Sequence, residues 1–336
     1  MQDNTVKNYI IGIDGGGTKS HLAVFDKSGK LVTVGKHGPL NHEVMQDSFT
    51  QLESELSDFI KDTLSGIGAT LEDVAFAVLG IAGADTEKQH EIISGIIKRI
   101  GLKEFVLCND AFLGVPAGCK GGIGICAING TGFSIAAVDN SSATVQVGGL
   151  GPYSNDCGGS SWFSWKLLAA VYGELFKCEP KTLMTERLFE RLGINDAKLY
   201  VDKITSDMAE GKITLSELNI MVFDAVALGD EVAISFLKES AHHYAGGITY
   251  LAKTLDFPVD QTLYITFAGS VFVKEKTSTL PNMIKEELSK RLSGRTIEFH
   301  KLHTVPVAGA VYWASKEAGF NIDIDSISDS LRKAGL

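Results

Sequence analysis

The sequence predicts an α/β protein built from two domains of the same design. Its 336 residues exceed the length of one typical domain. Apolar strand-like runs alternate with segments of helical periodicity, a pattern typical of α/β proteins. A strand, a glycine-rich turn and a second strand near the amino terminus return in similar form after residue 121. Such an internal repeat indicates a duplicated architecture.

The first half alternates strands and helices and ends at the glycine-rich stretch "GVPAGCKGGIG", where we place the domain boundary. The two predicted domains cover 1–117 and 118–336, and the last helix is a candidate to pack back on the first domain. The predicted elements of the first half are strands over 8–14, 20–26 and 30–36, a helix over 42–65, the strand "VAFAVLGIAG", a helix over 86–100, the strand "EFVLCND" and a short helix to about 118.

The second half opens with the repeat and is then richer in helices. "GIGICAINGTGFSIAAVDNSSATV" matches "NYIIGIDGGGTKSHLAVFDKSGKLV" at three places: Asp14 with Asn129, Thr18 roughly with Thr131, and Asp26 with Asp139. Two unrelated hairpins remain an alternative. The later predicted elements are helices over 159–175, 181–192, 214–227, 229–256, 271–292, 305–319 and 324–334, and strands in "QTLYITFAGSVF" and "RTIEFHKL".

Composition excludes several classes of protein. The net charge of −10 argues against binding to nucleic acid or anionic membranes, which requires a basic surface. Five scattered cysteines without a CxxC pair indicate reduced thiols in a cytoplasmic protein. The first residues show no signal-peptide pattern, and no apolar run reaches the ~18 residues of a membrane helix.

The turn in "GIDGGGTKS" is not a Walker-type phosphate loop. Thr18 stands where that motif needs a lysine, and the segment after it alternates like a strand rather than opening a helix. A bare glycine turn between strands still allows backbone N–H groups to approach phosphate oxygens. Asp14 would then serve a Mg²⁺ shared with the phosphates. A purely structural hairpin is the alternative.

Several motifs together resemble the N-acetylglucosamine kinase and BadF/BadG/BcrA/BcrD ATPase group of the actin-like sugar kinase superfamily. They are "IGIDGGGTKSHLAVFD", "LCNDAFLG", "INGTGFSIA" and "FAGSVF", in that order, and "PVAGAVYWA" resembles the family's closing helix. The resemblance implies two ribonuclease-H-like domains that close over ATP, Mg²⁺ and a sugar. It places the nucleotide at Gly15, Gly16, Gly17, Thr18, Lys19, Gly130, Thr131, Gly132, Gly269 and Ser270, and the metal at Asp14.

Asp110 is the candidate catalytic base. Phosphoryl transfer to a hydroxyl needs a carboxylate to accept the proton. Asp110 ends a strand at the carboxyl edge of a sheet, where α/β proteins place ligands, and it matches the family's catalytic aspartate. Its alternative role is to cap the helix that starts at Ala111.

The resemblance also implies a set of sugar-binding residues. Asn41 has an alternative role as a cap of the helix over 42–65, and the turn from Ile81 to Asp85 matches one that lines the sugar pocket. Where the family has Trp, Gly and Glu, this chain has Leu150, Asn155 and Cys157, which changes the shape and polarity of the pocket. The full predicted set is Asn41, Gly83, Asp110, Gly149, Leu150, Gly151 and Asp156.

The sequence thus predicts an ATP-dependent kinase that phosphorylates a hydroxyl of an amino sugar, N-acetylglucosamine or a relative. A partner-coupled ATPase and a non-catalytic sugar sensor are alternatives. The acceptor sugar, its hydroxyl and the oligomeric state, a homodimer in the family, are left open. His242 and His243, and the pair Trp162 and Trp165, are interpreted as surface or packing residues.

Overall fold

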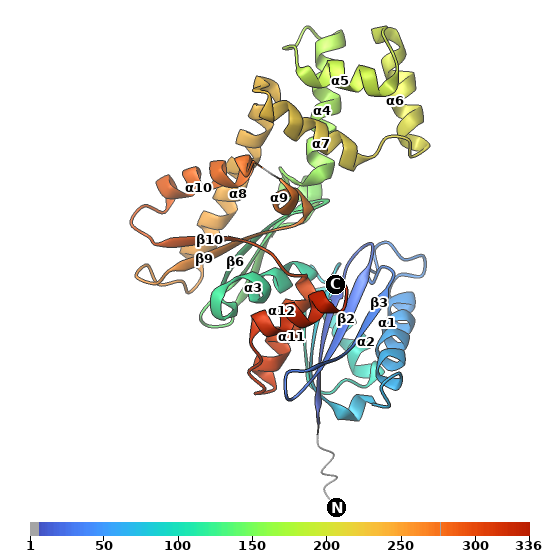
Figure 1. The fold of residues 1–336 in the computed structure, drawn as a ribbon, viewed down its shortest axis with the longest axis vertical. Helices are drawn as coiled ribbons and strands as arrows, with labels where there is room; N and C mark the ends of the chain where they lie inside the picture. The colour runs from blue at the N-terminus through green and yellow to red at the C-terminus, as the bar shows by residue number, and fades with distance from the viewer. Residues whose placement is uncertain (1–6, 276) are drawn as a thin grey trace, which may run out of the picture.

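The computed structural model describes residues 7–275 and 277–336 and shows two lobes, each built around a five-stranded sheet (Figure 1). The first sheet has the order β3-β2-β1-β4-β5 and the second, read from its far edge, the order β8-β7-β6-β9-β10. In each sheet the first three strands along the chain are antiparallel and the last two are parallel to the first. The strands are β1 (Tyr9–Gly15), β2 (Ser20–Asp26), β3 (Leu31–His37), β4 (Val74–Ile81), β5 (Phe105–Cys108), β6 (Gly124–Asn129), β7 (Phe133–Val138), β8 (Thr144–Gly148), β9 (Leu263–Ala268) and β10 (Ile297–Lys301).

The repeat predicted from the sequence is confirmed in its details. Oδ1 of Asp26, at the end of β2, accepts hydrogen bonds from the backbone N and Oγ of Ser28 at 2.8 and 2.6 Å. Oδ1 of Asp139, just after β7, accepts the same two bonds from Ser141, both at 2.8 Å. The same side-chain turn therefore closes the hairpin after the second strand of each sheet.

Helices cover both faces of the first sheet. Ile11 and Ile13 on β1 pack in one core with α1 and α2, whereas Ile10 points to the opposite face and packs with α11. This alternation follows from the two-residue period of a strand. The helices are α1 (Ser48–Ser65), α2 (Glu87–Ile100), α11 (Pro306–Glu317) and α12 (Ile324–Lys333).

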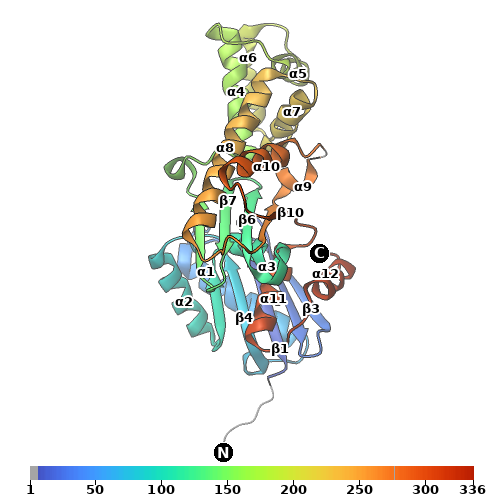
Figure 2. The same ribbon diagram turned by 90° about the vertical axis from the view of Figure 1, so that its left-hand side faces the viewer.

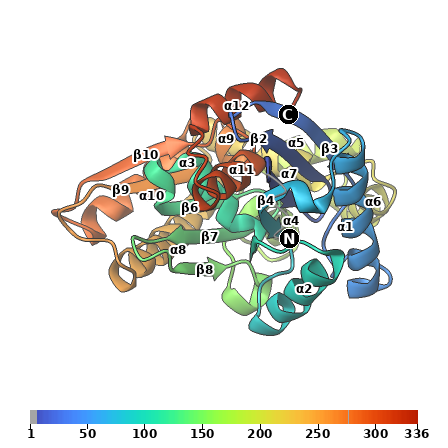
Figure 3. The same ribbon diagram turned by 90° about the horizontal axis from the view of Figure 1, so that it is seen from below.

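The helix α11 lies between the two sheets together with the short α3 (Gly114–Gly118), and Figure 3 shows it near the centre of the molecule. Its small residues allow this position. A Cβ built at Gly12 of β1 would lie 2.6 Å from the backbone N of Val311, and one at Gly309 would overlap the carbonyl oxygen of Leu113. The close packing predicted for Ala308, Gly309 and Ala310 is confirmed, because all three are buried.

The second lobe carries a helical extension, seen at the top of Figure 2. Its apolar core joins the second sheet to α4, α5, α7 and the long α8. The remaining helices are α4 (Gly159–Phe176), α5 (Leu183–Leu192), α6 (Tyr200–Ala209), α7 (Leu215–Ala227), α8 (Glu231–Thr254), α9 (Ser270–Lys274) and α10 (Thr279–Arg291), with single 3₁₀ turns at η1 (Leu71–Asp73), η2 (Asp110–Leu113), η3 (Lys120–Gly122), η4 (Gly151–Ser154) and η5 (Ala197–Leu199).

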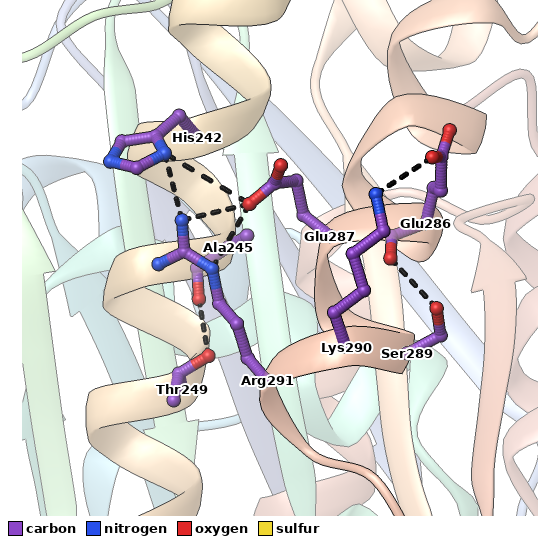
Figure 4. Close-up of polar contacts among 8 residues, drawn as sticks. All are labelled: His242, Ala245, Thr249, Glu286, Glu287, Ser289, Lys290 and Arg291. Atoms are coloured by element: carbon purple, nitrogen blue, oxygen red, sulfur yellow. Dashed lines mark hydrogen bonds and ion pairs between the residues drawn. The ribbon is translucent and has the colours of Figure 1, made fainter.

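Polar contacts hold α10 against α8 on the outer side of the second lobe (Figure 4). Arg291 donates to Glu287 within α10 at 2.9 Å and to Nδ1 of His242 on α8 at 2.8 Å. The His242 side chain is 68% exposed and does not line the cleft described below. The prediction that it is a surface or packing residue is confirmed.

Two predicted helices differ in the structure, and one observed helix was not predicted. The helix expected over 42–65 begins at Ser48, after a turn, and the helix expected over 271–292 is two helices, α9 and α10. Ser278, with φ 55°, lies between α9 and α10 and interrupts the helix expected over 271–292, because a left-handed residue cannot continue a helix. The sequence analysis missed α6. No helix in the described part of the chain is both long and apolar enough to cross a membrane.

Candidate active site

A cleft of about 1210 Å³ lies between the two lobes. Its floor comes from the carboxyl ends of parallel strands. Asp14 is near the end of β1, Asp85 follows β4 and Asp110 follows β5. From the second lobe come the turn after β6, with Thr131, and the turn after β9, with Ser270. Parallel strands present their carboxyl ends at one edge, so these segments meet although they are far apart in sequence.

Most of the predicted site residues line this cleft. They come from both lobes and from every predicted glycine turn, although the glycines of the first turn, Gly15 to Gly17, are not among them. The lining includes Asp14, Asn41, Gly83, Asp110, Gly130, Thr131, Gly132, Gly149, Gly151, Asp156, Gly269 and Ser270.

Six predicted residues are not among the lining residues: Gly15, Gly16, Gly17, Thr18, Lys19 and Leu150. In the first hairpin, the backbone N of Gly16 donates to the carbonyl of Lys19 at 3.3 Å, which closes the turn and leaves its tip exposed. Leu150, predicted to contact the sugar, is 52% exposed. The flanking Gly149 and Gly151 both have positive φ, and this loop conformation places the Leu150 side chain outside the cleft.

The glycine turns of the second lobe pack directly on one another. A Cβ at Gly269 would lie 2.5 Å from the carbonyl carbon of Asn129, so only glycine permits this approach. The N–H of Gly159, at the start of α4, donates to Oδ1 of Asn129 at 2.7 Å. A Cβ at Gly130 or Gly132 would meet nothing within 4 Å. The turn after β6 is thus held in place by the Gly269 turn and by α4, while Gly130 and Gly132 leave open space beside its backbone.

Asp110 lines the cleft, and its neighbour Asn109 provides the cap of the helical turn that follows β5. The side chain of Asn109 accepts the N–H of Ala111 at 2.9 Å, so the capping role considered for Asp110 belongs to Asn109. Burial, together with the nearby carboxylates of Asp14 and Asp85, raises the pKa of Asp110 to about 7. A carboxyl group with a pKa near neutrality is suited to proton transfer.

Asp85 is a lining residue that the sequence analysis did not select, although it ends the turn quoted for Gly83. Its Oδ1 accepts from Nδ2 of Asn109 at 2.9 Å. Burial and the charge of Glu43 raise the pKa of Asp85, while a polar contact from Gln146 across the cleft opposes the rise. The rule that pointed to Asp110, a carboxylate at the carboxyl end of a strand, would also have found Asp85.

Other lining residues had no clear signal in the sequence. Gln146 lies on β8, and its Nε2 donates to the carbonyl of Gly148 at 3.2 Å. Trp162, expected to be a packing residue, packs against the core of the second lobe and also lines the cleft. The further unpredicted polar residues of the lining include Glu43, Asn109, Ser134, Lys274, His303 and Arg332.

Asn41 and Gly83 meet at the same place in the cleft. Asn41 is not a cap of α1, since that helix begins at Ser48, and its Oδ1 instead accepts from the N–H of Glu43 at 2.9 Å. Gly83 has φ 82°, and a Cβ there would lie 2.6 Å from Oδ1 of Asn41. Glycine at position 83 therefore leaves the Asn41 amide room to reach the cleft.

Asp156 organises its own loop. Its Oδ2 accepts from the N–H groups of Gly149 and Gly151 at 3.0 and 2.7 Å, and its Oδ1 accepts from Oγ of Ser154 at 2.7 Å. These bonds fix the turn that replaces the family's tryptophan-containing stretch. Oδ2 already accepts two bonds, but Oδ1 accepts one and has a second lone pair, so Asp156 retains acceptor capacity toward a ligand at Oδ1.

Asp14 fits a magnesium ion that is shared with phosphates. Its Oδ2 is 4.0 Å from Nδ1 of His21, beyond hydrogen-bond distance. No group of three metal-ligating side chains occurs among residues 7–275 and 277–336. Magnesium is usually held by one or two carboxylates together with substrate phosphates, so a single aspartate in this cleft would fit such an ion.

Comparison with known proteins decides the family. The family model described as the BadF/BadG/BcrA/BcrD ATPase family matches residues 11–314, which is most of the chain. The protein belongs to this ATPase family. The match includes both sheets and every predicted site residue, and it confirms the resemblance inferred from the motifs.

Two curated relatives of this BadF/BadG/BcrA/BcrD family member are sugar kinases. The N-acetylmuramic acid/N-acetylglucosamine kinase of Clostridium acetobutylicum is 26% identical over 266 residues, 78% of this chain and 85% of that protein. The N-acetyl-D-glucosamine kinase of Dictyostelium discoideum is 23% identical over 292 residues, 84% and 90% of the two chains.

A solved structure confirms the fold of this family member. A protein of Chromobacterium violaceum, described as a candidate N-acetylglucosamine kinase, superimposes with a TM-score of 0.64 at 14% identity and covers 91% of this chain and 98% of its own. The prediction of an α/β protein with two ribonuclease-H-like domains and a cleft between them is therefore confirmed.

One departure from the family's usual sequence has a clear structural outcome. Cys157, at the position of the family's glutamate, is buried, and burial raises the pKa of its thiol. A thiol that stays protonated is a poor nucleophile. The raised pKa therefore argues against a covalent catalytic role for Cys157.

Proposed function

We propose that the protein is an ATP-dependent kinase that phosphorylates a hydroxyl of an amino sugar, with N-acetylglucosamine or a close relative as acceptor. The observation that carries this proposal is Asp110. Its carboxyl group lines the same cleft as the glycine turns after β6 and β9, and its pKa is raised to about 7. The curated relatives support the sugar kinase over a partner-coupled ATPase or a sugar sensor.

The chain's own residues suggest how the transfer proceeds. Asp110 takes the proton of the acceptor hydroxyl. The hydroxyl oxygen forms the new bond to the γ-phosphorus of ATP, and the bond between that phosphorus and ADP breaks. Asn41 and Asp156 orient the sugar, and Thr131 and the bare backbone at Gly132 contact the phosphates. Mg²⁺ at Asp14 would supply neutralisation of the charge on the phosphates. Water must be kept out of the cleft, because it would compete with the sugar.

Two further predictions concern the cellular setting. All five cysteines are free, and four are buried, which supports a reducing cytoplasmic location. The homodimer remains a prediction, with the exposed Trp165 and Tyr172 on α4 as candidate contacts.

The test of the proposal is an assay of ADP release from Mg–ATP with a panel of acceptors. The panel contains N-acetylglucosamine, glucosamine, N-acetylmuramic acid, N-acetylmannosamine, glucose and no sugar. Release that depends on one amino sugar supports the kinase and names its acceptor. Equal release in all samples would indicate a partner-coupled ATPase, and sugar binding without release would indicate a sensor.

Within that panel, we expect N-acetylmuramic acid to be a poorer acceptor than N-acetylglucosamine. The side of the cleft around Asp110 also carries Asp85 and Glu43, and its carboxylates would repel the carboxylate of the lactyl group. Like charges brought together at a binding site cost several kcal/mol, so kcat/KM should differ by at least about tenfold. Glu43→Gln should reduce this preference, and equal kcat/KM values in the native protein would contradict it.

The second prediction concerns pH. Because Asp110 must be ionised to accept a proton, kcat/KM should fall as the pH drops below about 7. The carboxylate of Asp85 raises the pKa of Asp110, so Asp85→Asn should lower that pKa and move the acid limb of the profile to lower pH. Glu53→Gln, on the outer side of α1, is the matched control and should leave the limb in place. An unchanged limb in Asp85→Asn would show that Asp110 does not control it.

A further inference from the structure

The last helix, α12, forms part of the wall of the cleft. Ser328, Arg332 and Leu336 line the cleft and are spaced four residues apart, which places them along one side of α12 and its end. The residues Val273 and Lys274, on the α9 segment that follows the Gly269 turn, also line this cleft. Figure 1 shows the end of the chain, just after α12, at the junction between the lobes.

The position of α12 is fixed by burial and by a link to the first sheet. Ile327 and Leu331 are fully buried in the core between the lobes. Beyond the helix, the carbonyl of Gly335 accepts from Nζ of Lys36 on β3 at 3.3 Å. Lys36 pairs across the strands with His21, the second residue after the glycine hairpin. The end of α12 therefore lies beside the strands that carry the first glycine turn.

The cleft carries few positive charges. Among the lining residues that the structure describes, Lys274 and Arg332 are the lysine and arginine; Lys274 ends α9 after the Gly269 turn, and Arg332 lies on α12. Glu43 raises the pKa of Asp85, and Asp14 and Asp85 raise that of Asp110, so these carboxylates lie close together. A polyanion entering the cleft would be attracted to the two cations and repelled by the carboxylates.

Arg332 can change partners at little cost. Its guanidinium is 3.0 Å from the carboxylate of Asp329, one turn earlier in α12, and the two side chains are 67% and 59% exposed. Exposed ion pairs of this kind contribute little to stability. A guanidinium binds phosphate oxygens through two parallel N–H groups, which makes it better suited to phosphate than to this weak local pair.

We propose that Arg332 binds the phosphates of the donor nucleotide, with Lys274 contributing from the α9 side. The proposal rests on the proposed function, in that it assumes a nucleoside triphosphate in this cleft. It makes α12, more than 300 residues from the first glycine turn, part of the nucleotide site.

The test measures the affinity for Mg–AMPPNP by titration calorimetry in the native protein and in three variants. Arg332→Ala should weaken binding by about tenfold, as expected for the loss of one exposed charge-assisted contact, while Arg332→Lys should recover part of it. Lys333→Ala removes the same charge from the next position, which does not line the cleft, and should change the affinity by less than about twofold.

Either of two results would overturn the proposal. One is an Arg332→Ala variant that binds Mg–AMPPNP as tightly as the native protein. The other is an equal loss in Lys333→Ala, which would indicate a general effect of net charge. Failure of the proposed function is seen separately, because then the native protein itself would bind no Mg–AMPPNP, or would bind it but transfer no phosphoryl group from Mg–ATP to any sugar. KM for the acceptor should be unchanged in Arg332→Ala.

Discussion

Asp110→Asn is expected to lower kcat for sugar phosphorylation by about 10²- to 10⁴-fold, the usual contribution of a general base. The amide keeps the size of the side chain but cannot accept the hydroxyl proton. Affinity for ADP should change little, because the role proposed for Asp110 is to accept the proton of the acceptor hydroxyl, and it is not among the residues proposed to contact the nucleotide. Steady-state kinetics and ADP titration measure the two quantities separately.

The stability of this variant distinguishes lost chemistry from lost fold. The folded protein raises the pKa of Asp110 from 3.8 to about 7, so native stability falls as the pH rises through that window. Asn carries no charge, and the variant should therefore melt at the same or a higher temperature than the native protein at pH 8. The stability difference attributable to ionisation should disappear below about pH 4, where the carboxyl is protonated in both states.

A matched acid far from the cleft provides the control for activity. Asp224 on α7 is exposed and paired with Arg187 at 2.9 Å, so Asp224→Asn removes one carboxylate without touching the site. Its kcat should equal that of the native protein. Full activity in Asp110→Asn would remove Asp110 from the mechanism.

Gly309→Ala is expected to have the largest effect on stability. A Cβ at this position in α11 would overlap the carbonyl oxygen of Leu113 and lie 2.9 Å from the backbone N of Ala117. Both atoms belong to backbone that cannot rotate away, so the helix itself must shift. Overpacking of a core costs about 1–3 kcal/mol and sometimes more. Thermal unfolding at constant pH measures the loss.

The same substitution in another helix separates packing from helix propensity. Gly95 lies in α2, where a Cβ would have as its nearest neighbour the flexible end of Arg99 at 3.4 Å. Gly95→Ala should be neutral or stabilise the protein by up to about 1 kcal/mol, because alanine favours a helix over glycine. If both variants unfold at the same temperature, close packing of α11 is not what requires Gly309.

A displaced α11 should also reduce activity. The helix contacts β1, which carries Asp14, and η2, which begins at Asp110. Even a shift of about 1 Å in catalytic groups can lower a rate by 10²-fold. We expect the residual folded fraction of Gly309→Ala to have a reduced kcat.

Part of the site could be predicted from the sequence because its signals are local. Asp110 and Asp14 were found from their place at the ends of apolar strands, and the glycine turns from their composition. The duplicated turn at Asp26 and Asp139 was visible as a repeat, since two residues of similar chemistry at similar spacing form the same hydrogen bonds. The family resemblance added the roles predicted for these residues in binding the nucleotide, the metal and the sugar.

Other assignments depended on geometry that the sequence does not contain. Whether Asp110 or Asn109 caps the helix depends on which side chain points at the Ala111 N–H. The outward direction of Leu150 follows from two positive φ angles beside it, and α1 starts six residues late because Asn41 forms a turn with Glu43 instead.

By itself, then, the sequence determined most strands of the two repeated units, their turns and the carboxylates at their edges, because strand period and turn chemistry are short-range properties. Only the tertiary structure decided which of these groups share a cleft. That outcome depends on how α11 packs between the two sheets and brings Gln146, Lys274 and Arg332 to the same space as Asp110. Packing of distant segments is set by the shape of many side chains together, which no local pattern records.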